Sequence, residues 1–159
     1  SATELQDFAA LVLAGGEVEP VGLDERIKKA EALVFLTQDG CLKGIAAVKN
    51  PEQDHKNGVL EKAQASLQAN EFSFELGWVF VFPSSRGIGL SHKLVQAALT
   101  ATGGRAIFAT SRSDNTPMHK VLNAHGFSRH GRAYASDRGN HNLVLFVSNA
   151  AKQDAPGMR

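Results

Sequence analysis

The segment from residue 71 to residue 104 constrains the fold more than any other stretch of the chain. Six apolar side chains occupy every second position: Phe72, Phe74, Leu76, Trp78, Phe80 and Phe82. This alternation predicts a strand, with a second face formed by Ser73, Glu75, Gly77, Val79 and Val81. Pro83 cannot donate a ladder hydrogen bond and should end the strand. After a glycine-containing turn, helical spacing of apolar residues from Leu90 predicts a helix that ends at Gly103-Gly104.

The N-terminal part of the chain is predicted to contain helices and then a hairpin. Thr3-Glu4-Leu5-Gln6 fits a capping box for a helix that ends at Gly15-Gly16, and a short second helix is expected around residues 23–30. Asp39-Gly40 suits a type I′ turn between strands over residues 32–37 and 41–48. Residues 50–57 are polar and contain Pro51, so we expect a loop there, followed by a helical stripe over residues 59–67.

Strands and helices alternate after residue 71. Ala106–Thr110 is a short apolar run typical of a buried parallel strand. Thr116 is the expected cap of a helix that begins at Pro117 and ends before Gly126, and residues 127–134 and 141–147 are expected to form the last two strands. The order predicts an α/β domain with a mixed sheet. We expect one domain over residues 1–150 and a frayed tail over residues 151–159.

Composition excludes several classes of protein. The chain has 43% hydrophobic and 21% charged residues, which is typical of a globular domain. No apolar run approaches the roughly 18 residues of a membrane span, and no secretory signal is visible, so we expect a cytoplasmic protein. Cys41 is the only cysteine, which excludes an internal disulfide and a cysteine-based zinc site. The histidines show no helical pair four residues apart, so we expect no metal.

The charge is distributed unevenly. Residues 1–82 contain 7 Lys/Arg and 13 Asp/Glu, whereas residues 83–138 contain 8 Lys/Arg and 2 Asp/Glu. A basic segment of this kind suggests a site for an anion, although a charge-balanced surface is the simpler alternative.

The turn over residues 86–91 is a candidate for that anion site. Its sequence is Arg86-Gly87-Ile88-Gly89-Leu90-Ser91, between a strand and a helix. Backbone N–H groups at such a helix start can hold a phosphate, although two glycines alone would also fit a turn that binds nothing. The turn does not complete other phosphate motifs: a Rossmann fingerprint would need glycine where His92 stands, and a P-loop would need Gly-Lys-Ser/Thr.

At these residues the sequence resembles the GNAT superfamily of acyl-CoA N-acyltransferases. Arg86 to Ser91 is similar to the family's Gln/Arg-x-x-Gly-x-Gly/Ala signature, with Ser91 as a departure at the last place. The segment from Asn115 to Gly126-Phe127 is similar to its second motif. The resemblance covers residues 71–148 closely and the N-terminal half in outline. It implies a mixed, splayed sheet flanked by helices.

The resemblance also implies a binding site for coenzyme A. The pyrophosphate would lie on the backbone N–H groups of Arg86, Gly87, Ile88, Gly89, Leu90 and Ser91. The pantetheine arm would pair with the strand edge at Val79 and Val81, and Asn115 would hydrogen-bond the arm from the other side. The positive charge of residues 83–138 suits such a polyanion.

Acyl transfer to an amine needs a base, a donor for the oxyanion and an exit for the thiolate. Glu75 is the candidate base, acting directly or through water. The alternatives are a surface carboxylate and a structural ion pair. Many family members have a tyrosine where this chain has Leu122, which we expect to be an apolar packing residue. Tyr134, the only tyrosine, is the candidate acid. Its alternatives are a packing role for the side chain and protonation of the thiolate by water.

We therefore predict an N-acetyltransferase that transfers acetyl from acetyl-CoA to a primary amine of a small molecule, by direct attack in a ternary complex. The alternatives are a non-catalytic acyl-CoA-binding module and an enzyme acting on a protein or peptide amine. Residues 50–70 lie where the family often lines the acceptor site, so His55, Lys56 and Glu61 are candidates to face it, with a solvated loop as the alternative. We expect no nucleic acid or membrane partner, and the sequence leaves a homodimer open.

Overall fold

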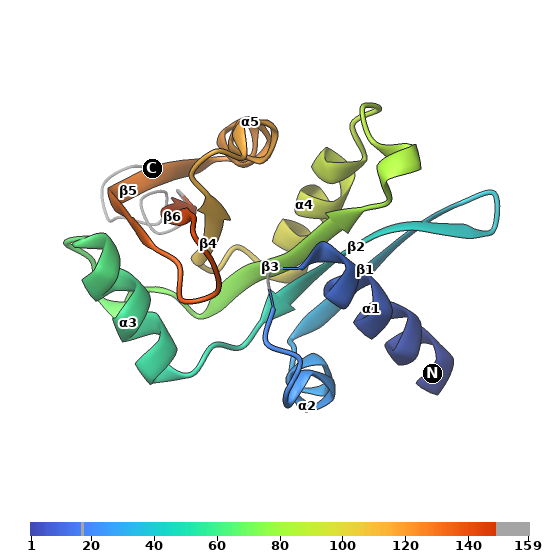
Figure 1. Cartoon of the computed structure of the whole chain (residues 1–159), viewed down its shortest axis with the longest axis horizontal. Helices are drawn as coiled ribbons and strands as arrows, with labels where there is room; N and C mark the ends of the chain where they lie inside the picture. Colours follow the sequence, from blue (N-terminus) through green and yellow to red (C-terminus); the bar gives the residue numbers. More distant parts are fainter. Residues whose placement is uncertain (17, 149–159) are drawn as a thin grey trace.

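The computed structural model, which describes residues 1–16 and 18–148, contains a six-stranded mixed sheet flanked by helices (Figure 1). The strand order is β1-β2-β3-β4-β6-β5. Only β3 and β4 run parallel, and the other neighbours are antiparallel. The predicted α/β fold class is confirmed. The strands are β1 (Ala32–Gln38), β2 (Cys41–Lys49), β3 (Phe74–Val81), β4 (Ile107–Arg112), β5 (Phe127–Ala135) and β6 (Asn142–Ser148).

Five α-helices cover the two faces of the sheet in the described part of the chain. They are α1 (Ala2–Gly15), α2 (Leu23–Lys28), α3 (Gln53–Ala63), α4 (Leu90–Ala101) and α5 (Thr116–Ala124). Helices α4 and α5 share one core cluster with the sheet, whereas α1 and α2 pack over β2 and β3, and α3 over β4 and β6, on the other face. Two 3-10 turns, η1 (Ala69–Glu71) and η2 (Pro83–Ser85), flank β3. The core therefore has two layers of helix with the sheet between them.

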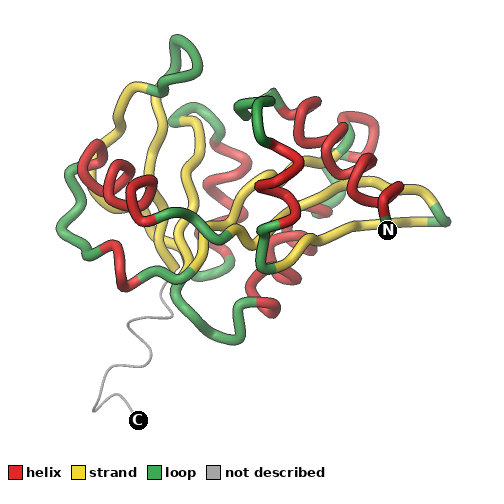
Figure 2. The backbone as a smooth tube through the Cα atoms, turned by 90° about the horizontal axis from the view of Figure 1, so that it is seen from below, coloured by secondary structure: helices red, strands yellow, loops and turns green. Residues whose placement is uncertain are grey.

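The sheet splays between β3 and β4. These strands are paired only at Phe74 with Ile107 and at Glu75 with Phe108. Beyond Glu75, β3 stays paired with β2 and diverges from β4, so the strands of the two halves run in different directions (Figure 2). The edge of β3 that faces β4 consequently has no strand partner over Gly77–Val81.

A bulge at Trp78 interrupts β3, and the predicted unbroken alternation is wrong beyond this point. The register with β2 shifts between Ile45 and Ala47, and Trp78 has a positive φ of 53°. One extra residue in a strand reverses the faces of all residues after it. Trp78 and Phe80 thus pack with α1 and α2, while Val79 packs with α4 and no longer shares a face with Glu75. Val81 likewise lies against α4.

The turn and strand predictions were otherwise close to the structure. Asp39 and Gly40 both have positive φ, 52° and 75°, as a type I′ turn requires. The strand predicted from Glu71 begins at Phe74, because η1 occupies the first residues. The loop predicted over residues 50–57 is wrong from Gln53 onward, where α3 begins.

Two predicted helix caps are wrong. Ser1 rather than Thr3 caps α1, because its hydroxyl accepts a hydrogen bond from the Glu4 N–H at 3.2 Å. Asn115 rather than Thr116 caps α5, because its Oδ1 accepts from the Met118 N–H at 3.2 Å. In both cases the side chain nearest the free N–H groups lies one or two residues before the residue that the pattern suggested.

The predicted tail over residues 151–159 lies outside the described residues. Within the residues that are described, no helix is long and apolar enough to cross a membrane.

Candidate active site

A cleft of about 960 Å³ opens where β3 and β4 diverge. Its walls come from the α1–α2 loop, α3, β3, β4 and the β5–β6 turn. The cleft brings together six residues singled out from the sequence, which are His55, Glu75, Val79, Asn115, Leu122 and Tyr134. Val81 and the turn over residues 86–91 are not among its lining residues, although they continue from the same strand.

Glu75 is held in the floor of the cleft by two basic side chains. Its side chain is 7% exposed, and its Oε1 lies 3.6 Å from Lys49 Nζ and 3.1 Å from His55 Nε2. Burial raises the pKa of Glu75, but the Lys49 charge and the His55 hydrogen bond outweigh burial, so the pKa lies below its ordinary value. Glu75 is therefore an anion at neutral pH. The surface-carboxylate alternative is wrong, and an ion pair is present.

Gly77 makes room for Lys49. The two strands place Lys49 opposite Glu75, and the lysine stem crosses β3 at Gly77, where an added Cβ would lie 2.5 Å from Lys49 Cδ. The ammonium lies 4.7 Å from the centre of the Trp78 ring. Lys49 could not be predicted from the sequence, because only the pairing of β2 with β3 reveals that it faces Glu75.

His55 stands in the first turn of α3 and lines the cleft. Its side chain is 50% exposed, and its ring lies 6.4 Å from that of Phe108. The sequence made His55, Lys56 and Glu61 candidates to face the acceptor site, with a solvated loop as the alternative. Of these three residues, only His55 lines the cleft, while Lys56 donates to the Phe72 carbonyl at 3.1 Å. The helical pattern was recognised only from residue 59, so the place of His55 in the first turn of α3 was not predicted.

Tyr134 lines the cleft from β5. Burial, and then the negative charges of Glu75 and Asp137, raise the pKa of Tyr134 to about 12. The phenol therefore keeps its proton at neutral pH and can act as a hydrogen-bond donor. Leu122 is 1% exposed in the core cluster, as the sequence predicted for an apolar packing residue.

The glycine turn before α4 presents backbone rather than side chains. Gly87 and Gly89 have φ of 87° and 81°, and an added Cβ at either residue would meet nothing within 4 Å. Gly89 is the N-cap of the 12-residue helix α4 and supplies no capping side chain. The first N–H groups of α4 are thus left to a ligand or to water. Arg86 reaches back to β3, with its Nε 2.9 Å from the Val81 carbonyl oxygen.

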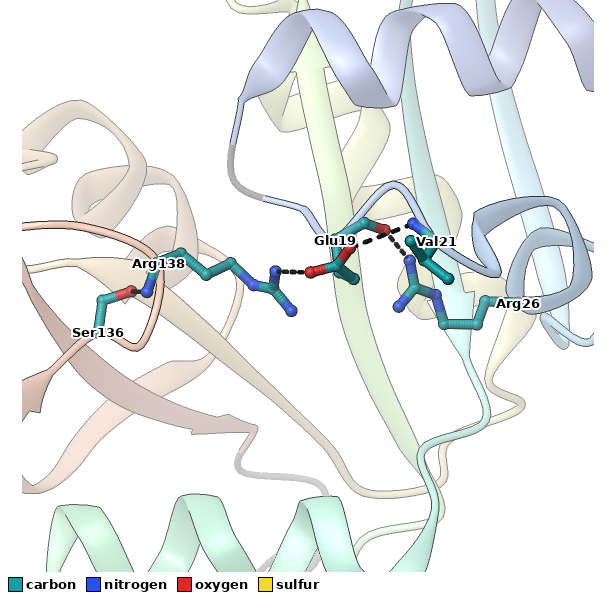
Figure 3. Close-up of polar contacts among 5 residues, drawn as sticks. All are labelled: Glu19, Val21, Arg26, Ser136 and Arg138. Carbon is teal, nitrogen blue, oxygen red and sulfur yellow. Dashed lines mark hydrogen bonds and ion pairs between the residues drawn. The ribbon is translucent and has the colours of Figure 1, made fainter.

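An ion pair crosses the cleft between Glu19 and Arg138 (Figure 3). Arg138 Nη1 lies 3.3 Å from Glu19 Oε2 and links the β5–β6 turn to the α1–α2 loop. Glu19 is positioned by the Val21 N–H, which donates to its Oε1 at 3.3 Å, and by Arg26, which donates to its carbonyl. The Val21 hydrogen bond and Arg138 lower the pKa of Glu19. Both partners are nearly half exposed, so solvent screens the attraction.

No group of three or more metal-ligating side chains is arranged to hold an ion among residues 1–16 and 18–148.

Sequence and structure comparisons identify the family. Residues 9–127 match the acetyltransferase (GNAT) family, so the chain belongs to that family. It is an acyl-CoA-dependent acetyltransferase, as the sequence predicted. No curated protein matches the chain.

Solved structures with the same fold share little sequence with this chain. A GNAT-family acetyltransferase from Streptococcus agalactiae is 15% identical, with a TM-score of 0.68 over 92% of this chain and 90% of that one. The ribosomal-protein-alanine N-acetyltransferase of Brucella melitensis is 14% identical, with a TM-score of 0.68 over 93% and 95%. The protein yncA of Salmonella typhimurium, solved with its cofactor acetyl-CoA, is 16% identical, with a TM-score of 0.64 over 99% and 92%. At these identities the likeness shows the fold alone.

Proposed function

We propose that the chain transfers the acetyl group of acetyl-CoA to a primary amine of a small molecule, by direct attack in a ternary complex. The observation that carries this proposal is the cleft between β3 and β4, where Glu75, His55 and Tyr134 meet beside an unpaired strand edge. A thioester on that edge would lie next to groups that can move a proton.

The free edge of β3 and the turn before α4 suit coenzyme A. The two amides of the pantetheine arm can pair with backbone groups at Val79 and Val81, because β4 has left that edge. The N–H groups from Gly87 to Ser91 can receive the pyrophosphate at the start of α4, whereas the Arg86 N–H donates to the Pro83 carbonyl at 3.4 Å. Asn115 uses its Oδ1 to cap α5, which leaves its amide nitrogen to donate to the arm.

The ion pair between Glu19 and Arg138 favours a small acceptor over a peptide. It joins the two walls of the cleft, so an extended chain could lie there only after the pair had separated. A small amine can occupy the enclosed space while the pair stays formed. A protein or peptide amine is the alternative that the experiment must distinguish.

Within this site, Glu75 supplies the negative charge that favours loss of the proton from the amine. The N–H of Val79, which belongs to the part of β3 beyond the last β3–β4 pair, is the proposed donor to the oxyanion. Tyr134 donates a hydrogen bond towards the departing thiolate, and water supplies the proton.

Release of free thiol from acetyl-CoA, measured with a panel of small amines and of peptides with free N-termini, tests the proposal. We expect turnover with at least one small amine and slower turnover with peptides. Turnover with peptides alone would overturn the acceptor class. Binding of CoA without thiol release on any amine would overturn the proposed function.

A further inference from the structure

We propose that His55 is the catalytic residue that accepts the proton of the amine, and that Glu75 is a positioning residue acting through the imidazole. This inference rests on the proposed function and assigns its proton transfer to a residue on α3. The hydrogen bond between the two side chains, together with their different exposure, supports it.

The geometry separates the two roles. Glu75 Oε1 already contacts both His55 Nε2 and Lys49 Nζ, and its side chain is almost buried. Both basic partners contact the same carboxylate oxygen, and little of the carboxylate is exposed to the cleft. His55 lines the same cleft with half of its side chain exposed, whereas the side chain of Glu75 is 7% exposed. The imidazole is therefore more accessible to a bound amine than the carboxylate is.

The hydrogen bond also sets the tautomer of His55. Glu75 is an anion, so its oxygen only accepts, and the His55 Nε2 must carry the proton and donate it. The other ring nitrogen, Nδ1, then carries the lone pair. A neutral imidazole held in one tautomer by a carboxylate keeps one ring nitrogen available to accept a proton.

The charged groups around His55 include both signs, and they act in opposite directions on a protonated imidazole. The negative charge of Glu75 on β3 stabilises a protonated His55 directly. The positive charge of Lys49 on β2, which contacts the same carboxylate oxygen, destabilises it. The neutral phenol of Tyr134 adds no charge from β5. The remaining acidic groups of the cleft near α3 and the β5–β6 turn are Glu52, Asp54 and Asp137, and Lys62 pairs with the last of them.

The proposed step conserves atoms and charge. The ammonium of the acceptor gives one proton to His55 Nδ1, and the neutral amine uses its lone pair to form a C–N bond with the thioester carbonyl carbon. The C–S bond breaks, and its electron pair leaves with the CoA thiolate. The remaining extra N–H proton passes through water to the thiolate, and His55 returns its proton to the solvent. The products are the amide, the CoA thiol and one proton.

The test compares His55→Gln with His130→Gln, using a small amine that the parent enzyme acetylates. His130 is a matched control, because it lies on β5 outside the cleft lining and contacts Ser128. We expect His55→Gln to lower kcat/KM at pH 7 by about 10²–10⁴-fold, the usual contribution of a general base. His130→Gln should stay within about threefold of the parent, well below that contribution. CoA affinity, measured by calorimetry, should be unchanged in both variants.

Three further readouts distinguish a base from a structural residue. The loss in His55→Gln should shrink as the pH rises towards about 10, where an alkylamine loses its proton unaided. Imidazole in solution should partly restore the rate of His55→Ala. If Glu75 acts through His55, the double variant Glu75→Gln/His55→Gln should lose no more activity than His55→Gln alone.

The outcomes separate this inference from the proposed function. If the parent acetylates an amine and His55→Gln stays within about threefold, below the expected contribution, the inference is overturned and the function stands. A parallel loss of CoA affinity would also overturn it, because the histidine would then be structural. Absence of thiol release by the parent with every amine would overturn the function and this inference together.

Discussion

Replacing Tyr134 with phenylalanine should lower kcat/KM by no more than about tenfold. The pKa of about 12 for Tyr134 exceeds the roughly 8.5 of an alkyl thiol by about 3.5, so full proton transfer from the phenol to a thiolate is uphill by about 4.8 kcal/mol. Water can protonate a thiolate, which is a competent leaving group. The variant loses a hydrogen bond to a sulfur that carries only part of its charge in the transition state. Such a bond is worth about 1.5 kcal/mol, the boundary between neutral and charged acceptors, and corresponds to about a tenfold change in rate.

The assay is thiol release over a range of pH, with the parent and Tyr134→Phe at saturating acetyl-CoA and limiting amine. CoA affinity should match that of the parent, because Tyr134 on β5 is not among the residues proposed to hold the pyrophosphate or the pantetheine arm. The pH profiles of the two proteins should have the same shape. A fall of about 10²-fold, the size of a lost general acid, would show that Tyr134 delivers the proton and that the reasoning from its pKa is wrong.

Three other predictions follow from the same geometry. Gly89→Asp should weaken CoA binding far more than Gly40→Asp, which imposes the same positive-φ strain at a distant hairpin turn; equal affinities by calorimetry would refute the pyrophosphate site. The folded-state pKa of Glu75 is lowered, so its charge stabilises the fold above the ordinary carboxyl pKa of about 4.3, and this stabilisation is lost as the pH falls through the folded-state pKa. Urea unfolding should accordingly show that Glu75→Gln destabilises the protein at pH 7 and that this difference shrinks at pH 3; a difference independent of pH would contradict it. Arg138→Gln should lower KM for bulky or peptide amines and leave KM for small amines unchanged, and an unaltered acceptor range would show that its pair with Glu19 does not restrict entry.

Much of the fold could be predicted from local sequence patterns. Asp39-Gly40 fixed the hairpin because both residues must adopt positive φ. The apolar face of α5 placed Leu122 in the core, since helical spacing alone decides which side of a short helix is buried. The glycine turn could be recognised because its strand, Pro83 and helix are contiguous in the sequence.

The charge constellation around Glu75 could not be predicted in the same way. Lys49 and His55 come from two other elements, and only the β2–β3 pairing and the path of α3 bring them to one oxygen atom. The bulge at Trp78 also escaped the sequence pattern. Both faces of β3 are apolar there, so a reversal of faces leaves no trace in the alternation of residue types.

The bulge at Trp78 reverses which residues of β3 face each side of the sheet, and this determines how the strand responds to deletions. Removing Trp78 would restore a regular pleat and would leave Val79 facing α4 and Phe80 facing α1, because one residue would then stand opposite Ala46 instead of two. Removing Phe80 instead would turn Val81 from α4 towards α1, into space shaped for a side chain of a different volume. A screen of deletions along β3 should therefore find loss of folding after the bulge, whereas deletion of Trp78 should cost mainly the packing of its own ring against Phe8. Deletions in the β1–β2 turn should also be tolerated.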